Sequence, residues 1–332
     1  MFNYIQGETA NDVWIKAFDS VMKSSDVNSR VGCAREVLHA ALSINNPIQR
    51  WISQKNPPIS ISYALADFIW TMSGSNDATI INYWNPSLHK FSGSYSNYPG
   101  AYGDRIIHRY GINQLEKVYD TLKNNPESRQ AVILIWDPRT DLPQIKGEPN
   151  NEDIPCNLCS MVKVRNNRLE WTQIMRSNDL VLGFPYDIVL FTSLQEVLSS
   201  WLHLEVGSYN HISDSLHIYN DKVDKIGIVS NNLYNSDSLR VEHDDYRNVI
   251  DMIFYNMKRI SKEDDLSSED LVLISKMDTG YESYNNILKI LCAYAANKKQ
   301  ATSIRDKIVT SCTNIAFTEM WNTWLNHYGG GK

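Results

Sequence analysis

Residues 158–175 predict a β-hairpin, and this hairpin restricts the possible folds of the chain more than any other segment. Residues 158–165 alternate between apolar and polar side chains, as a strand does, and Asn166-Asn167 favours the positive φ of a tight turn. Residues 168–175 are expected to form the second strand of the hairpin. An apolar helix over 186–204 and a further strand over 208–219 are expected to follow. A hairpin connected through an apolar helix to another strand predicts an α+β arrangement, in which helices pack on a sheet.

The rest of the chain predicts two regions that differ in secondary structure. Before residue 225 we expect helices and strands, with a glycine- and proline-containing loop over 85–104 of the kind that often carries function. After residue 224 the strand patterns end and helices follow. We therefore interpret residues 1–224 as an α+β catalytic body and residues 225–332 as a helical C-terminal extension packed on the same body. The expected helices are 9–22, 62–72, 112–122, 244–262, 269–276, 282–297 and 311–327, and the other expected strands are 36–44 and 130–136.

Charge and apolar runs exclude several classes of protein. The 332 residues carry 32 basic and 38 acidic side chains, a net charge of −6, which disfavours binding to nucleic acid or to an anionic membrane. The longest apolar runs, 131–136 and 290–296, are much shorter than the ~20 residues of a membrane span. No secretory leader is visible, and five scattered cysteines favour free thiols, so a cytoplasmic protein is expected. An anionic ligand would have to be bound by a few placed arginines.

Cys156 and Cys159 have the spacing of a Cys-x-x-Cys pair. No second cysteine pair or spaced histidine pair accompanies them, which disfavours a metal site or a redox dithiol. Two interpretations remain: small residues at the start of a strand, or a single nucleophilic cysteine. A nucleophilic thiol needs a group that favours the thiolate. Arg176 follows the hairpin that Cys156 begins, so its guanidinium is expected to lie beside the thiol.

Four motifs in order give a specific pattern. They are Pro155-Cys156-Asn157, Met175-Arg176-Ser177-Asn178-Asp179, Leu182-Gly183-Phe184-Pro185-Tyr186-Asp187 and Ser215-Leu216-His217-Ile218-Tyr219. In this order and spacing the chain resembles the thymidylate synthase superfamily, and most closely its cytidylate and deoxycytidylate hydroxymethylase branch. Upstream, Ser29-Arg30-Val31-Gly32, Gly100-Ala101-Tyr102-Gly103 and Asn125 to Gln130 resemble further family motifs. The resemblance covers about residues 28–224 and implies an α+β fold with a mixed β-sheet packed with helices, plus the helical extension.

The resemblance implies an enzyme that transfers a one-carbon unit from 5,10-methylenetetrahydrofolate to carbon 5 of a pyrimidine nucleotide, without a metal. Cys156 would add to carbon 6 of the base, with Arg176, Tyr102 and Asp67 as further catalytic residues. Arg30, Arg176 and Ser177 would hold the 5′-phosphate, and Arg129 would reach it from the second subunit of a homodimer. The sugar hydroxyl would be bound by His217 and Tyr219. Contacts to the folate are implied for Trp84, Asp179 and Gly183, and Asp179 would also contact the nucleotide.

Asp187 indicates the base, because it stands where the synthases carry an asparagine that binds uracil. Cytosine presents an amino donor at carbon 4 and a bare N3 acceptor. A carboxyl group accepts from the amino group and, when protonated, also donates to N3. An ionised carboxylate facing O4 of uracil is repelled. The residue therefore favours CMP or dCMP, and the alternative is an aspartate that only caps the following helix.

Three other departures from the synthase pattern keep alternatives open. Asp67 replaces the family glutamate and is one methylene shorter, which affects proton transfer more than binding. Gln130 replaces a second interfacial arginine, so Arg105 or Arg139 would have to substitute, and Trp84 is equally consistent with a core aromatic residue. The preferred interpretation is a hydroxymethylase, in which water captures the intermediate. The alternatives are a methylating synthase acting on dUMP or dCMP, and a nucleotide-binding homologue without activity.

Overall fold

A mixed β-sheet forms the centre of the computed structural model, which describes residues 2–29, 31–143, 147, 152–262 and 266–329. Its main strands run in the order β1 (Asn3–Gly7), β3 (Cys33–Ile44), β9 (Glu205–Tyr219), β7 (Arg168–Met175), β6 (Asn157–Arg165) and β5 (Val132–Leu134). Two short strands extend it, with β2 (Asp26–Asn28) on β3 and β8 (Asn178–Asp179) on β9. The β1–β3, β7–β9 and β8–β9 pairs are parallel and the others antiparallel.

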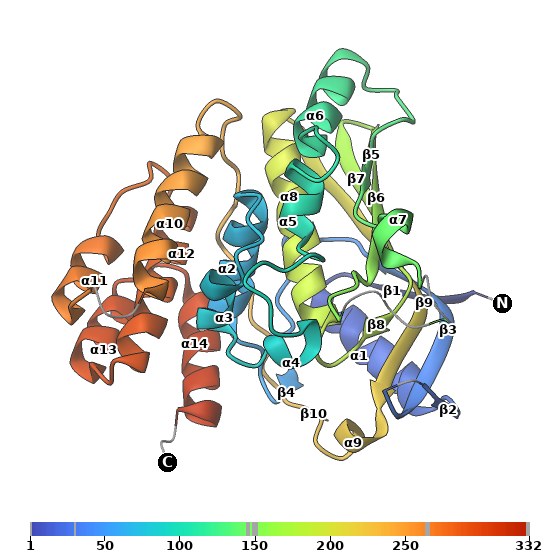
Figure 1. Ribbon diagram of the computed structural model, residues 1–332, viewed down its shortest axis with the longest axis horizontal. Helices are drawn as coiled ribbons and strands as arrows, with labels where there is room; N and C mark the ends of the chain where they lie inside the picture. The colour runs from blue at the N-terminus through green and yellow to red at the C-terminus, as the bar shows by residue number, and fades with distance from the viewer. Residues whose placement is uncertain (1, 30, 144–146, 148–151, 263–265, 330–332) are drawn as a thin grey trace.

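The expected hairpin is confirmed as β6 and β7. Asn166 and Asn167 both have positive φ, at 50° and 59°, as a tight turn between these strands requires. Helix α8 (Phe184–Trp201) follows and contacts β7 and β9, and every residue of this helix except Tyr186 is buried. Helices α1 (Ala10–Met22) and α6 (Gln114–Asn124) also pack on the sheet (Figure 1).

The C-terminal part is helical and packs against helix α2 (Ile61–Met72) (Figure 1). It contains α10 (Tyr246–Ser261), α11 (Ser268–Ser275), α12 (Glu282–Lys298), α13 (Thr302–Thr310) and α14 (Ile315–Tyr328). The capping box between Ser267 and Asp270 is confirmed. One continuous hydrophobic core includes residues of both regions, such as Val13 in α1 and Trp321 in α14. Helix α2 therefore lies between α8 and the C-terminal helices, contacting both.

Several elements differ from the sequence expectation. The expected 85–104 loop contains the helix α4 (His89–Ser92) and the first residues of α5 (Tyr102–Ile107), while α3 (Ala78–Trp84) precedes it. The strand β1 and the helix α13 were not expected, because both are short and have weak apolar periodicity. The remaining short elements are α7 (Pro138–Asp141), α9 (Asn220–Val223), and the pair β4 (Lys55–Asn56) with β10 (Gly227–Ile228).

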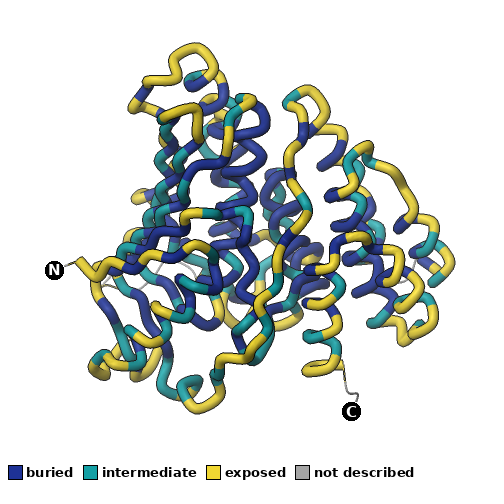
Figure 2. The backbone as a smooth tube through the Cα atoms, turned by 180° about the vertical axis from the view of Figure 1, so that it is seen from behind, coloured by how far each residue is buried: buried dark blue, intermediate teal, exposed yellow. Residues whose placement is uncertain are grey.

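The face of the sheet opposite α8 is partly exposed, as the teal and yellow strand residues in Figure 2 illustrate. The strand register aligns one row of side chains across this face from β5 to β1. Its members are Leu134, Cys159, Ile174, Ile212, Ala41 and Tyr4, each half-buried or exposed. Within the part of the chain that the structure describes, no helix has the length and apolar character of a membrane span.

Candidate active site

The β6–β7 hairpin brings Cys156 and Arg176 together. Asn157 pairs with Met175 at the open end of the hairpin, so the residues just outside this pair face each other. The backbone N–H of Arg176 donates to the carbonyl of Cys156 at 3.0 Å. Its guanidinium donates to the carbonyls of Pro155 at 2.9 Å and Ile154 at 3.2 Å. The expected position of Arg176 beside the Cys156 segment is therefore what the structure has.

Two opposing influences act on the Cys156 thiol. Burial raises its pKa, and the carboxyl groups of Asp187, Asp153 and Asp179 raise it further, while the Arg176 guanidinium lowers it. The net shift is upward, so the thiol is protonated at neutral pH in the free protein. Arg176 is nevertheless the cation that stabilises negative charge on this sulfur when a proton leaves.

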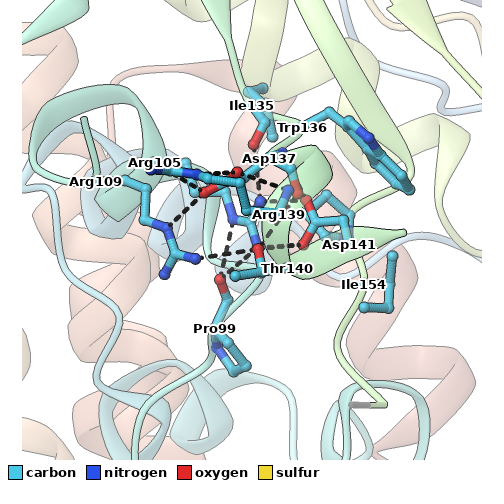
Figure 3. A network of polar contacts seen from close by, with 12 residues as sticks. Pro99, Arg105, Arg109, Ile135, Trp136, Asp137, Arg139, Thr140, Asp141 and Ile154 are labelled. Atoms are coloured by element: carbon cyan, nitrogen blue, oxygen red, sulfur yellow. Dashed lines mark hydrogen bonds and ion pairs between the residues drawn. The ribbon is translucent and has the colours of Figure 1, made fainter. Parts of the chain in front are cut away.

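A network of polar contacts holds the segment around Trp136 and Asp137 (Figure 3). The buried guanidinium of Arg105 makes two bonds to Asp141, at 2.5 and 2.9 Å, and also donates to the carbonyls of Pro99 and Ile135. Asp137 pairs with Arg139, which lowers the pKa of Asp137 to about 2. Trp136 precedes Asp137 in the chain, and the guanidinium carbon of Arg176 lies 5.5 Å from the centre of its ring.

This network corrects the suggestion that Arg105 substitutes for the arginine replaced by Gln130. Arg105 is fully buried and bonded to Asp141, and so cannot turn toward a phosphate. Arg139 is 73% exposed and pairs with the buried carboxyl group of Asp137, so its role as a substitute stays a prediction. Both arginines stabilise the loops around Trp136.

Asp187 lies in the first turn of α8, almost fully buried. Its Oδ2 accepts from Asn178 Nδ2 at 3.0 Å, and its Oδ1 accepts from Asn157 Nδ2 at 3.4 Å. Helix α8 has no side-chain cap hydrogen bond at its N-terminus, so the helix-capping alternative for Asp187 is wrong. Burial, reinforced by the nearby charge of Asp67, raises the pKa of Asp187 to about 8 despite the two amide donors. The carboxyl group is therefore mostly protonated at neutral pH.

Asp67 on α2 and Tyr102 on α5 approach the same place from the other side. Burial raises the pKa of Asp67 to about 7. The pKa of Tyr102 lies well above its usual value, through burial and through the charges of Asp187, Cys156 and Asp67, while a hydrogen bond with Asn157 opposes the shift. Four titratable groups that sequence reasoning assigned to the site thus lie within electrostatic reach of one another.

The pairing of β8 with β9 places Asp179 beside His217. Asp179 Oδ1 accepts from the backbone N–H groups of Val181 at 2.8 Å and Leu182 at 3.0 Å. The rings of His217 and Tyr219 pack edge to face, with their centres 5.0 Å apart. The expected residues of this strand pair are therefore adjacent.

Two residues of this part were missed by sequence reasoning. Glu36 on β3 lies opposite His217, and it accepts a hydrogen bond from Ser215, whose hydroxyl is 3.3 Å from His217 Nδ1. Ser215 stands where the family motif has an aspartate, and a carboxylate from the neighbouring strand lies near this histidine instead. Lys55 is buried near Asp179, and burial lowers its pKa to about 8. Only the pairing of distant segments identifies these residues, so no sequence pattern could have found them.

The remaining expected residues lie in different settings. Gly183 lies beside Asp187, and a side chain there would start 3.6 Å from Asp187 Oδ2. Trp84 is 2% exposed and belongs to the hydrophobic core, which favours the core-aromatic alternative over a ligand contact. Ser177 is half-buried next to Arg176, and Arg129 is exposed before β5, where its charge acts on Lys163. Arg30 lies outside the described residues.

A mixed sheet carries a cysteine, an arginine and buried carboxyl groups beside one long helix, and comparison with known proteins identifies the family. The family model described as thymidylate synthase matches residues 53–263, so the chain belongs to the thymidylate synthase family. The expected α+β fold of that family is thereby confirmed.

Curated relatives fall into two groups. The deoxyuridylate hydroxymethyltransferase of Bacillus phage SP01 is 31% identical over 229 residues, which is 65% of this chain and 58% of the relative. The corresponding protein of Pseudomonas phage M6 is 29% identical over 166 residues, covering 49% and 46%. A thymidylate synthase of Francisella tularensis subsp. holarctica is 28% identical over 181 residues, covering 51% and 65%. The chain spans about half the length of the two phage relatives.

Proposed function

We propose that this protein is a folate-dependent transferase that adds a hydroxymethyl group to carbon 5 of a cytosine nucleotide, CMP or dCMP. The observation that carries the proposal is the buried carboxyl group of Asp187, held by two amide donors where it can contact a base. The family and the phage hydroxymethyltransferase relatives support one-carbon transfer to a pyrimidine.

Cys156 is the proposed nucleophile. Its sulfur adds to carbon 6 of the base, which makes carbon 5 nucleophilic. Arg176 stabilises the thiolate during this step and also faces the anionic substrate. Tyr102 and Asp67 are proposed to move the protons that addition and elimination require, since both lie within electrostatic reach of Cys156 or Asp187.

The nucleotide is proposed to lie along β9 and the end of the hairpin. Arg176, Ser177 and Arg30 would bind the 5′-phosphate, and His217 and Tyr219 would bind the sugar hydroxyl. Glu36 supports this role for His217 through Ser215, because its carboxylate fixes the hydroxyl that contacts Nδ1. A ribose and a deoxyribose differ here by one hydroxyl group, so both sugars belong to the test.

The methylenetetrahydrofolate would supply the one-carbon unit. Gly183 fits this role, because without a side chain its backbone lies beside Asp187, where a Cβ would already be in contact with Asp187 Oδ2. Asp179 fits through a carboxyl group held by two backbone donors beside Lys55 and His217. Trp84 does not fit, since its ring is in the core.

The protonated form of Asp187 supports the choice of cytosine. A neutral carboxyl group carries one acceptor oxygen and one hydroxyl donor, which complement the amino group and N3 of cytosine. The same group can pair with uracil in the reverse sense, with the hydroxyl toward O4 and the other oxygen toward N3–H. This observation and the names of the phage relatives support a second candidate, hydroxymethylation of dUMP.

The mass of the product tests the proposed function. CMP, dCMP and dUMP are each incubated with the protein and methylenetetrahydrofolate. We expect CMP or dCMP to gain the mass of a hydroxymethyl group. Conversion of dUMP alone would replace the proposal by the second candidate, and gain of a methyl group would indicate a synthase.

A homodimer formed through the open face of the sheet is proposed as the active assembly. The apolar row from Leu134 to Tyr4 crosses this face, and an exposed apolar area of this kind favours association. Arg129 is exposed before β5, at the edge strand of the same sheet, so it is available to a second copy.

Replacing Ile174, in the middle of that row, by aspartate is expected to convert the dimer into a monomer and to abolish activity. Burying an unpaired carboxylate in an interface costs several kcal/mol, on the order of 2–5. Light scattering after size-exclusion chromatography measures the mass, and Ile315→Asp on the exposed start of α14 is the matched control. A wild-type monomer, or an Ile174→Asp protein that remains a dimer, would contradict the proposed interface.

A further inference from the structure

A chain of buried polar side chains leads from Trp171 to Asp187. The indole N–H of Trp171 donates to Gln173 Oε1 at 3.1 Å, and Gln173 Nε2 donates to Asn157 Oδ1. Asn157 Nδ2 then donates to Asp187 Oδ1 at 3.4 Å. Trp171, Gln173 and Asn157 are each fully buried, so water does not replace these partners.

The direction of every bond in this chain follows from its two fixed ends. An indole N–H can only donate, so it requires the oxygen of the Gln173 amide. The backbone carbonyl of Cys159 can only accept, and it lies 3.2 Å from Gln173 Nε2. Gln173 is thus fixed with its nitrogen toward Asn157, which in turn places the Asn157 nitrogen toward Asp187. Ser160 also donates to Gln173 Oε1, but its hydroxyl can rotate and does not set the direction.

Asn157 therefore offers Asp187 a hydrogen and no lone pair. A proton on the Asp187 carboxyl group has no acceptor in Asn157, and it is left available to a ligand. We propose that Gln173 and Asn157, fixed by Trp171 and the Cys159 carbonyl, are positioning residues that hold Oδ1 of Asp187 as an acceptor and leave the proton to Oδ2. The carboxyl group then presents one fixed donor–acceptor order to the base, and this order determines base preference. This inference rests on the proposed function, because it assumes that Asp187 contacts the base.

The second amide that bonds to Asp187, that of Asn178, has no neighbouring group in the part of the chain that the structure describes that fixes its orientation. Asn178 Nδ2 donates to Asp187 Oδ2 at 3.0 Å, but Asn178 Oδ1 is buried and without a hydrogen-bond partner among the described residues. The orientation of Asn178 is thus set by Asp187 itself and by weak contacts with Met175 Sδ and with His211 Nε2 at 3.5 Å. Only the Asn157 side has a direction imposed from outside the site.

The pKa of Asp187 reports directly whether Asn157 donates a hydrogen bond to its carboxyl group. A donor that bonds to the carboxylate lowers the pKa, so replacing the Asn157 donor by an acceptor is expected to raise it. Several titratable groups act on or lie near the same carboxyl group and have to remain unchanged in the test. They are Asp67 and Tyr63 on α2, Tyr102 on α5, Cys156 before β6, and Tyr209 and His211 on β9.

The variant Asn157→Asp tests the inference, because it replaces the nitrogen facing Asp187 by oxygen without a change of shape. Gln173→Leu removes the donor that fixes the orientation of the Asn157 amide. Ser160→Ala is the matched control, since Ser160 is equally buried and bonds to the same amide without setting its direction. Dissociation constants of dCMP and dUMP are measured by calorimetry, and the pKa of Asp187 by NMR of ¹³C-labelled aspartate, assigned with Asp187→Asn.

We expect the ratio of the two dissociation constants to fall toward one by about tenfold in Asn157→Asp, which corresponds to one hydrogen bond of about 1.4 kcal/mol. The ratio in Gln173→Leu should move in the same direction, and the pKa of Asp187 should rise in Asn157→Asp. Both quantities should stay within about twofold, or about 0.3 pH units, of the wild-type values in Ser160→Ala.

The outcomes separate this inference from the proposed function. The base that the wild-type protein prefers tests the proposed function, whereas the change of ratio and of pKa tests the role of Asn157 and Gln173. An Asn157→Asp protein that weakens both nucleotides equally, with an unchanged pKa of Asp187, would overturn the inference. If the wild-type protein binds neither nucleotide, the proposed function fails and the NMR titration alone decides whether Asn157 sets the protonation of Asp187.

Discussion

The Asp187→Asn protein is expected to prefer dUMP over dCMP, with a change in the ratio of kcat/KM values of about 100-fold or more. A carboxamide cannot exchange its donor and acceptor by moving a proton, and the Asn157 donor would hold the amide oxygen at the position of Oδ1, so the amide presents one fixed order to the base. By resemblance to the synthases, whose asparagine at this position binds uracil, that order is expected to match O4 and N3–H. A site built to bond one arrangement discriminates strongly against the reverse, because a buried polar group is then left unpaired. Rates with each nucleotide, measured in competition, give the ratio directly.

The exposed carboxylate of Asp214, paired with His39 on the surface, provides the control variant Asp214→Asn. Its preference should equal that of the wild-type protein. An Asp187→Asn protein with unchanged base preference would refute the role assigned to Asp187, even if total activity fell.

The wild-type preference should also depend on pH. The pKa of Asp187 is raised to about 8, and the proposed bond to N3 of cytosine requires the protonated form. The affinity for dCMP is therefore expected to be highest at neutral pH and to fall as the pH rises above about 8. The affinity of the Asp187→Asn protein should show no such decline. Calorimetric titrations between pH 6.5 and 9.5 measure the effect.

Substitution of Cys156 by serine is expected to lower turnover by at least about 10⁴-fold. A serine hydroxyl is a much weaker acid than a thiol, so the surroundings that release the thiol proton do not make the hydroxyl a nucleophile, and Arg176 stabilises a thiolate but not a neutral hydroxyl. Release of tritium from carbon-5-labelled dCMP or CMP follows the covalent step itself, because only addition at carbon 6 makes that hydrogen labile.

The same measurement distinguishes an enzyme from a nucleotide-binding homologue without activity. Wild-type protein that releases no tritium in the presence of folate, but binds the nucleotide, would support the latter. Cys33→Ser, which changes an exposed thiol on β3, is the control and should retain full release. Full activity of Cys156→Ser would contradict the mechanism.

The local chemistry of the site could be predicted from the sequence, because its motifs lie within or next to the elements that position them. The two asparagines of the turn determine the register of the hairpin as far as Cys159 and Ile174. A bulge between Asn157 and Cys159 then shifts the pairing by one residue and sets Cys156 against Arg176. The residues Asp187, Asp179 and His217 likewise follow from short segments with defined ends. The predicted helix boundaries differ from the observed ones by a few residues, and these differences do not change the element on which each of these site residues lies.

The positions of other residues in and around the site depend on contacts between segments that are far apart in the sequence. Glu36 and Lys55 come close to the site only because β3 pairs with β9 and β4 lies near β8. The sequence offers Arg105 as a phosphate ligand, but its burial and its ion pair with Asp141 remove it from that role. The sequence is consistent with Trp84 either as a folate contact or as a core residue, and the structure shows its ring in the hydrophobic core.

The sequence by itself determined which groups meet at the site: a thiol, a guanidinium and a carboxyl group, each carried by a motif whose neighbours in the chain fix its position. Only the tertiary structure decided the state of these groups. The pKa of Asp187 is raised by burial among α2, α8 and the sheet, and the direction of its hydrogen bond with Asn157 is set by Trp171 and Gln173 on β7. Residue type is a local property of the chain, whereas desolvation and hydrogen-bond direction depend on everything packed around the residue.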